Sequence, residues 1–106
     1  MSDASRIFSA LADPNRLTIF ENLVSGRAST ATALAADLDI TRQAAAKHLS
    51  LLVDAGLASS SRSGRETLYR SELAPLSDVS KWISTVESQW TQRLAALKTL
   101  SERTGS

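Results

Sequence analysis

The chain has 106 residues, of which 42% are hydrophobic and 22% charged, with no cysteine, one histidine and a net charge of +1. This length suits one domain with a modest core, and the composition is that of a folded protein, not a disordered one. The lack of cysteine excludes disulfides and thiolate metal sites, and without a signal-like start or long apolar run we expect a cytoplasmic protein with no membrane partner.

Two helices are predicted in the first 25 residues. Ala4 to Leu11 forms a short helix that carries Ile7 and Leu11 on one face. Asp13 and Pro14 then indicate a helix start, because Asp accepts hydrogen bonds from free backbone N–H groups and Pro fits the first turn. This second helix is expected to end at Ser25-Gly26 and to bury Leu17, Phe20, Leu23 and Val24.

A helix-turn-helix unit is predicted next. Ser29 or Thr30 begins its first helix, whose inner face carries Leu34, Ala35 and Leu38. After a link at Asp39-Ile40, Thr41 can cap the second helix and Gly56 can close it in a left-handed conformation. Within this second helix one buried face is expected, made of Ala45, Leu49 and Leu52.

Beyond Gly56 the pattern changes to that of a β-hairpin. Two short extended runs, Leu57 to Arg62 and Glu66 to Arg70, flank the segment Ser63-Gly64-Arg65. Gly64 supplies the positive φ that a tight hairpin turn requires. The sequence therefore predicts a two-stranded ribbon with Arg62 and Arg65 at its tip.

The last element is a long amphipathic helix that begins after Pro75. From Leu76, apolar residues recur in steps of three and four over about seven turns. A domain this small cannot cover such a stripe, so part of it should meet a second copy of the chain. The residues expected in a homodimer interface are Ile7, Leu11, Val79, Trp82, Ile83, Val86, Trp90, Leu94 and Leu97.

Together these elements predict one domain over residues 1–106, mostly α with a small β-hairpin, with five helices and a two-stranded wing. Between Thr41 and Arg70 lie five basic and two acidic residues, whereas the rest of the chain holds seven basic and nine acidic ones. Positive charge is thus concentrated on the second helix of the helix-turn-helix and on the hairpin, which favours a nucleic-acid partner.

We expect double-stranded DNA to be contacted by the start of that helix and by the wing. Arg pairs with guanine and Gln with adenine, whereas hydroxyls and Lys suit phosphates or bases. Arginines at the wing tip would reach phosphates or a minor groove. The predicted DNA-binding residues are Thr41, Arg42, Gln43, Ala46, Lys47, Ser50, Arg62 and Arg65. The alternative is an ordinary solvated surface.

Other reactive side chains favour structural roles. His48 is expected to pack and hydrogen-bond at the edge of the core, because a lone histidine cannot build a zinc site. Arg16 is expected to be a structural ion-pair partner, with DNA contact as the alternative. Trp82 and Trp90 suit an interface better than a ligand pocket. No set of side chains suggests catalysis, so we predict no enzyme, no cofactor and no metal.

Three segments carry a family resemblance: LADPNRLTIFENL, ITRQAAAKHLSLLVDAGL and RSGRETLYR. In this order they resemble the ArsR/SmtB family of winged helix-turn-helix transcriptional repressors, from about Arg6 to Leu100. The resemblance implies a homodimer, held by the first and last helices, that binds a roughly palindromic operator and releases it when an effector binds.

The departures from the family concern the effector. Thr30 and Thr32 stand where metal-sensing members place cysteines, and the last helix lacks the histidines of zinc and nickel sensors. The resemblance therefore implies a repressor that metal does not control. Two alternatives stay open: a metabolite-sensing regulator with a pocket at the dimer interface near Trp82 and Trp90, and a winged helix that serves as a protein-interaction module.

Overall fold

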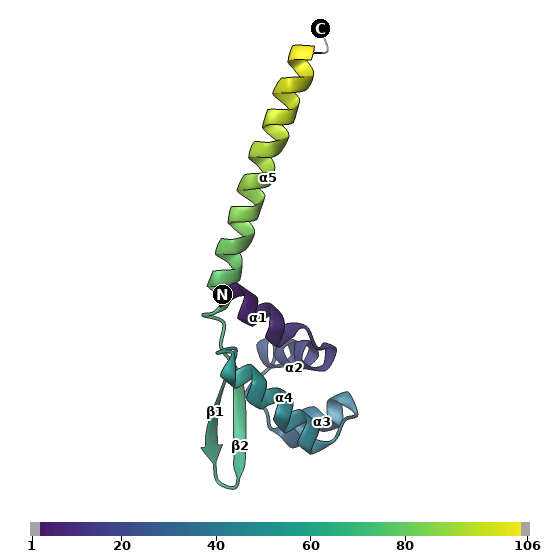
Figure 1. The fold of residues 1–106 in the computed structure, drawn as a ribbon. Coiled ribbons are helices and arrows are strands. Elements are labelled where there is room, and N and C mark those ends of the chain that lie inside the picture. The colour runs from purple at the N-terminus through teal and green to yellow at the C-terminus, as the bar shows by residue number, and fades with distance from the viewer. Residues whose placement is uncertain (1–2, 105–106) are drawn as a thin grey trace.

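The structure, a computed structural model, describes residues 3–104. Within them five helices and one two-stranded antiparallel hairpin confirm the predicted fold (Figure 1). In chain order the elements are α1 (Asp3–Leu11), α2 (Pro14–Ser25), α3 (Ala31–Leu38), α4 (Arg42–Asp54), β1 (Ala58–Ser63), β2 (Glu66–Ser71) and α5 (Leu76–Thr104).

Side-chain caps begin three of the helices, as their sequences predict. The Asp13 carboxylate accepts hydrogen bonds from the backbone N–H groups of Asn15 and Arg16, at 2.8 and 3.1 Å. The Thr30 hydroxyl oxygen accepts from the third residue after it at 3.1 Å, and that of Thr41 does the same at 3.0 Å. These bonds satisfy N–H groups that have no partner inside the helix, so they set where α2, α3 and α4 begin.

The core lies around α4, with α2 and α3 packed against it and with residues of α1 and of the start of the hairpin completing it. Its largest fully buried side chains are Ile19, Leu34, Leu49, Leu52 and Leu57. The predicted burial of Leu17 and Val24 is wrong, since these side chains are 40% and 45% exposed. Helix α2 turns Ile19, Phe20 and Leu23 inward, and Leu17 lies about 200° around the helix from Ile19.

Two tight links orient α4. Before it, Asp39 adopts a left-handed conformation with φ of 55°, and the Ile40 N–H donates to the Ala35 carbonyl at 3.1 Å. After it, Gly56 has φ of 79°, and the Leu57 N–H donates to the Leu52 carbonyl at 2.9 Å. The predicted helix-turn-helix and its glycine stop are both present, and they fix the directions in which α4 enters and leaves the core.

The hairpin is slightly displaced from the predicted runs. Its register pairs Ala58 with Ser71 and Ser63 with Glu66, which leaves Gly64 and the next residue as a two-residue turn. Gly64 has the expected positive φ, at 62°. Leu57 precedes the first strand and is fully buried, because it fills the core at the exit from α4.

Helix α5 leaves the body in the direction opposite to the hairpin (Figure 1). Its 29 residues extend about 43 Å at 1.5 Å per residue, which makes the molecule 73 Å long and 24 Å wide. Residues 81–103 are all exposed. Near its start, Trp82 meets Phe8 of α1 edge to face, with ring centroids 5.3 Å apart. No helix in the described part of the chain is long and apolar enough to cross a membrane.

Candidate nucleic-acid interface

The start of α4 presents polar side chains on a buried support. Ala45, Leu49 and Leu52 have no exposed surface and anchor the helix in the core. Around them the predicted contact residues Thr41, Arg42, Gln43, Lys47 and Ser50 are exposed, and Ala46 is half-buried. Because the apolar side is held by three neighbouring elements, the polar side keeps one direction relative to the hairpin.

The exposed residues of α4 point in two directions. Gln43, Lys47 and Ser50 follow one another at spacings of four and three and share one outer face. Arg42 and Ala46 form a neighbouring row that faces the hairpin, since both line a cleft between α4 and the wing. The predicted residues are therefore close together, but they do not form a single surface.

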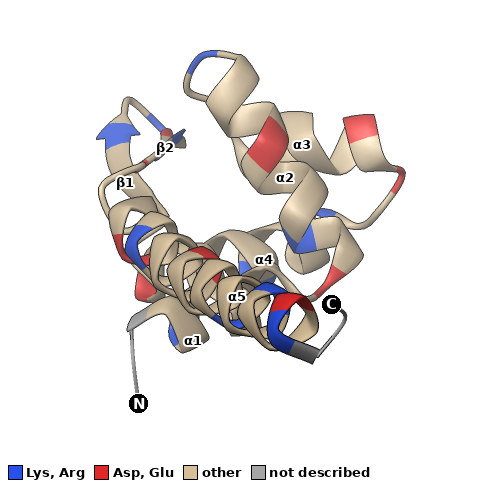
Figure 2. Ribbon diagram, turned by 90° about the horizontal axis from the view of Figure 1, so that it is seen from above, with Lys and Arg blue, Asp and Glu red and all other residues tan. Residues whose placement is uncertain are grey.

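This cleft, which we call the basic cleft, has a volume of about 140 Å³. Its walls are the start of α3, the start of α4 and both strands of the hairpin. The hairpin carries basic segments, which are blue in Figure 2. The lining residues are Thr30, Ala31, Thr32, Arg42, Ala46, Arg62, Arg65, Glu66, Thr67 and Tyr69. The two predicted wing arginines thus lie beside a predicted residue of α4.

His48 departs from its predicted hydrogen bonding. The residue is half-buried, and among the described residues its buried Nδ1 has no hydrogen-bond partner. Packing at the edge of the core is as expected, but no backbone or side-chain group reaches this nitrogen. No group of three or more His, Cys, Asp or Glu side chains that could hold a metal ion occurs within residues 3–104.

Arg16 is structural, though not through the predicted ion pair. Its Nε donates to the Ala10 carbonyl at 2.6 Å and its Nη2 to the Ser9 carbonyl at 3.4 Å. The guanidinium therefore caps the carboxyl end of α1 from within α2, where a positive charge is favoured. The Arg16 N–H, donating to Asp13, is the largest cause that lowers the pKa of that carboxyl below its ordinary value of 3.8.

The residues predicted at a dimer interface fall into two groups. Ile7 is 2% exposed and belongs to the chain's own core, so it has no surface to offer a second copy, while Leu11 and Val79 are half-buried. The α5 apolar stripe is 40% to 56% exposed and consists of Trp82, Ile83, Val86, Trp90, Leu94, Leu97 and Leu100. Phe8, which the sequence did not single out, is 44% exposed beside Trp82.

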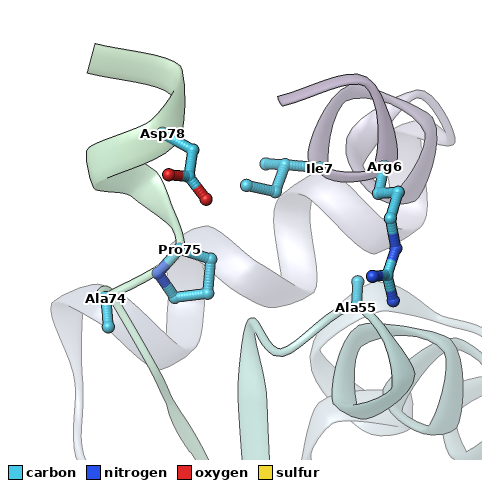
Figure 3. A pocket seen from close by; sticks show the side chains of 6 residues that line it. All are labelled: Arg6, Ile7, Ala55, Ala74, Pro75 and Asp78. Atoms are coloured by element: carbon cyan, nitrogen blue, oxygen red, sulfur yellow. The ribbon is translucent and has the colours of Figure 1, made fainter. Parts of the chain in front are cut away.

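The two tryptophans do not share a pocket in the single chain. They are eight residues apart on one helix, about 12 Å along its axis. Trp82 packs on Phe8, whereas Trp90 borders a shallow hollow with Val86, Gln89 and Arg93. A larger pocket of about 370 Å³ lies elsewhere, at the foot of α5 (Figure 3).

A three-helix core with a helix-turn-helix, a basic wing and an exposed polar helix start defines a winged helix-turn-helix protein. The family model that describes a helix-turn-helix domain matches residues 11–60. Among curated proteins, the uncharacterized HTH-type transcriptional regulator YuzN of Bacillus subtilis strain 168 is 42% identical over 84 residues, covering 73% of this chain and 91% of that protein.

Solved structures give the same assignment. An ArsR-like transcriptional regulator from Rhodococcus sp. RHA1 is 37% identical with a TM-score of 0.78, covering 93% of this chain and 92% of that one. The homodimeric winged helix-turn-helix DNA-binding domain of a possible ArsR-family regulator from Mycobacterium bovis is 26% identical with a TM-score of 0.61, covering 87% and 82%. This chain belongs to the ArsR family of winged helix-turn-helix transcriptional regulators.

Proposed function

We propose that this transcriptional regulator is a dimeric, sequence-specific repressor that acts in the cytoplasm on a roughly palindromic operator. The observation that carries the proposal is the exposed face of α4 made of Gln43, Lys47 and Ser50 beside the basic cleft. In winged helix-turn-helix proteins this second helix of the motif enters the major groove. Amide, ammonium and hydroxyl groups on that face match the hydrogen-bonding edges of bases.

Dimerisation would supply the second recognition helix. The α5 apolar stripe exposes seven large side chains to water along one face of the helix. Monomeric proteins rarely expose an apolar patch of this extent. The Mycobacterium bovis relative is a homodimer. A two-fold axis through paired α5 helices would place two α4 helices on successive major grooves, about 34 to 36 Å apart, and so demands a palindromic site.

The direct test is selection of binding sites from fragments of genomic DNA, followed by fluorescence anisotropy with the recovered duplex and a shuffled duplex of equal length. We expect tighter binding to the recovered duplex and a two-fold symmetric consensus. Transcription in vitro from a promoter that carries this site should fall when the protein is added. Equal affinity for both duplexes would contradict sequence-specific regulation, and increased transcription would contradict repression.

We further propose that metal does not control DNA release. Threonine hydroxyls, present at positions 30 and 32, are weak ligands for the soft ions that thiolates bind. Both threonines face the basic cleft, where positive charge would repel a cation. Zinc, nickel and cadmium ions, added singly to the protein–operator complex, should leave its anisotropy unchanged. Release by one of these ions, reversed by EDTA, would overturn this part of the proposal.

A metabolite-controlled repressor is the second candidate, and one observation favours it. The pocket of Figure 3 lies between α1, the turn after α4 and the start of α5, and it is lined by Arg6, Ile7, Ala55, Ala74, Pro75 and Asp78. Its volume of about 370 Å³ is within the range of small-molecule sites. A thermal-shift screen of metabolites, followed by DNA release, tests it; a hit whose effect survives Asp78→Ala would not be using this pocket.

A protein-interaction module, by contrast, has no need of the charge that this surface carries. Arg42, Lys47, Arg62 and Arg65 are all exposed on α4 and the wing. Their replacement by Ala in one variant should abolish DNA binding and leave the dimer intact. A full-length chain that binds no duplex under low salt, where phosphate contacts are strongest, would favour the module instead.

A further inference from the structure

We propose that the basic cleft binds one phosphate of the DNA backbone. In this proposal Arg42 contacts the phosphate together with the wing and does not hydrogen-bond to a base. The inference rests on the proposed function and assigns affinity and sequence discrimination to different residues. Arg42, Arg62 and Arg65 would supply affinity for any duplex. Sequence discrimination would be left to the outer face of α4, which carries Gln43, Lys47 and Ser50.

The direction of Arg42 is the first observation. Arg42 and Ala46 lie one turn apart on α4, and both line the cleft. Ala46 is small and half-buried, so it leaves room between the helix and the hairpin for a group to enter. Gln43, one residue along and about 100° further around the helix, is not among the lining residues. Arg42 therefore faces the wing, and its neighbour Gln43 does not.

The charge in the cleft is the second observation. Three guanidinium groups and one carboxylate, that of Glu66, line it. Among residues 3–104 none of these guanidinium groups has a carboxylate within 4.0 Å, and Arg62 reaches only the Thr67 hydroxyl, at 3.5 Å. The amino ends of α3 and α4 add positive ends of two helix dipoles. This charge favours binding of an anion. The planar guanidinium group of arginine can donate two parallel hydrogen bonds to the oxygens of a phosphate.

The walls of the cleft are held together before any ligand arrives. Ser29, just before α3, and Tyr69 of β2 exchange two backbone hydrogen bonds, at 2.9 and 2.7 Å. Thr30 follows directly and caps α3 with its hydroxyl. This bridge ties the hairpin to the helix-turn-helix, so that arginines from both meet at one place. A preformed site loses less conformational freedom on binding, which favours affinity.

The size of the cleft decides which phosphate it takes. Pockets for small molecules have volumes of about 300 to 1,000 Å³, whereas this cleft has about 140 Å³. A nucleotide or sugar phosphate is too large to be enclosed, but a single phosphate group fits. The cleft also opens between the recognition helix and the wing, which are the two elements expected to straddle a DNA strand. We therefore assign it a backbone phosphodiester.

The test compares Arg42→Ala with Gln43→Ala on the selected operator and on a shuffled duplex over a range of salt; the two positions are adjacent and both side chains are exposed. Arg42→Ala should weaken both duplexes by the same factor and lower the slope of log K against log salt by about 0.9. Gln43→Ala should weaken the operator alone and leave the slope unchanged. Thermal melts of both variants establish that each is folded. Loss of operator binding alone by Arg42→Ala would overturn the proposal.

A methylphosphonate scan locates the phosphate. Replacement of one phosphate per half-site by neutral methylphosphonate should weaken the wild type strongly at a single position. At that position Arg42→Ala should show no further loss, because the two changes remove the same interaction. Independent, additive losses at every position would contradict a shared contact.

A final experiment distinguishes a phosphate of the DNA backbone from a free phosphate ligand as the group that the cleft binds. Inorganic phosphate, exchanged for chloride at constant ionic strength, should not release the operator. Arg42-dependent release at millimolar phosphate would overturn the assignment to DNA and make the cleft an effector site. If the wild type binds neither duplex, the proposed function itself fails, and this result is distinct from a wild type that binds while Arg42→Ala alters specificity.

Discussion

Trp90 is the side chain on which dimerisation can be tested most sharply. It lies near the middle of α5 and is 56% exposed in the single chain. A tryptophan side chain presents about 200 Å² to water, so about 110 Å² of Trp90 remains to be covered. At about 25 cal/mol per Å², complete burial in a symmetric dimer would contribute about 5.5 kcal/mol over two protomers. Trp90→Ala should therefore raise the dimer Kd by between about 10³- and 10⁴-fold.

Sedimentation over a dilution series measures this Kd directly. Gln92→Ala is the matched control, because Gln92 is exposed on the same stretch of α5 but about 200° around the helix from Trp90. We expect Gln92→Ala to dimerise as the wild type does and Trp90→Ala to sediment as a monomer. Operator binding by Trp90→Ala should weaken in step, since one α4 alone covers half a site. Equal Kd values for Trp90→Ala and wild type would refute an interface through the α5 apolar stripe.

Three further predictions concern the elements that hold α4 and α2 in place. Thr41→Ala removes the α4 cap and should lower the free energy of unfolding by about 1 kcal/mol in urea titrations, whereas Thr41→Ser should keep most of it. Because hydrogen bonds lower the pKa of Asp13 in the folded chain, its contribution is full above the ordinary carboxyl pKa and is lost as pH falls through the folded value. Thermal melts should then show a shallower acid decline for Asp13→Asn. Gly56→Ala should cost about 1 to 2 kcal/mol for a positive φ, with its new Cβ 3.4 Å from Pro75 Cγ; an unchanged melting temperature would contradict this.

Local chemistry explains why most of the fold could be predicted. The caps Asp13, Thr30 and Thr41 act on N–H groups two or three residues away, so their effect is visible in a short stretch of sequence. Gly56 and Gly64 take conformations that other residues rarely adopt. The change from helical to alternating periodicity between them marks the hairpin. Each of these signals depends only on near neighbours along the chain.

Side chains whose positions depend on residues distant in the sequence could not be placed in this way. In α2, both Leu17 and Ile19 are apolar, and only the packing of α2 against the rest of the core determines that Ile19 is fully buried. Ile7 could face a second copy or the core, and the structure puts it in the core. Arg16 finds the carbonyl oxygens of Ser9 and Ala10 because α1 folds back onto the start of α2. No periodicity in the sequence predicts that α1 folds back in this way.

The sequence by itself determined the elements, their order and the kinds of side chain at the start of α4, because helix caps, turns and periodicity are local. Only the tertiary structure decided which way those side chains point. The Ser29–Tyr69 bridge draws the wing against the helix-turn-helix, and it thereby brings Arg42 beside Arg62 and Arg65, some twenty residues further along the chain. The same arrangement leaves the next residue, Gln43, outside the basic cleft, since hydrogen bonds between distant segments determine which residues share a site.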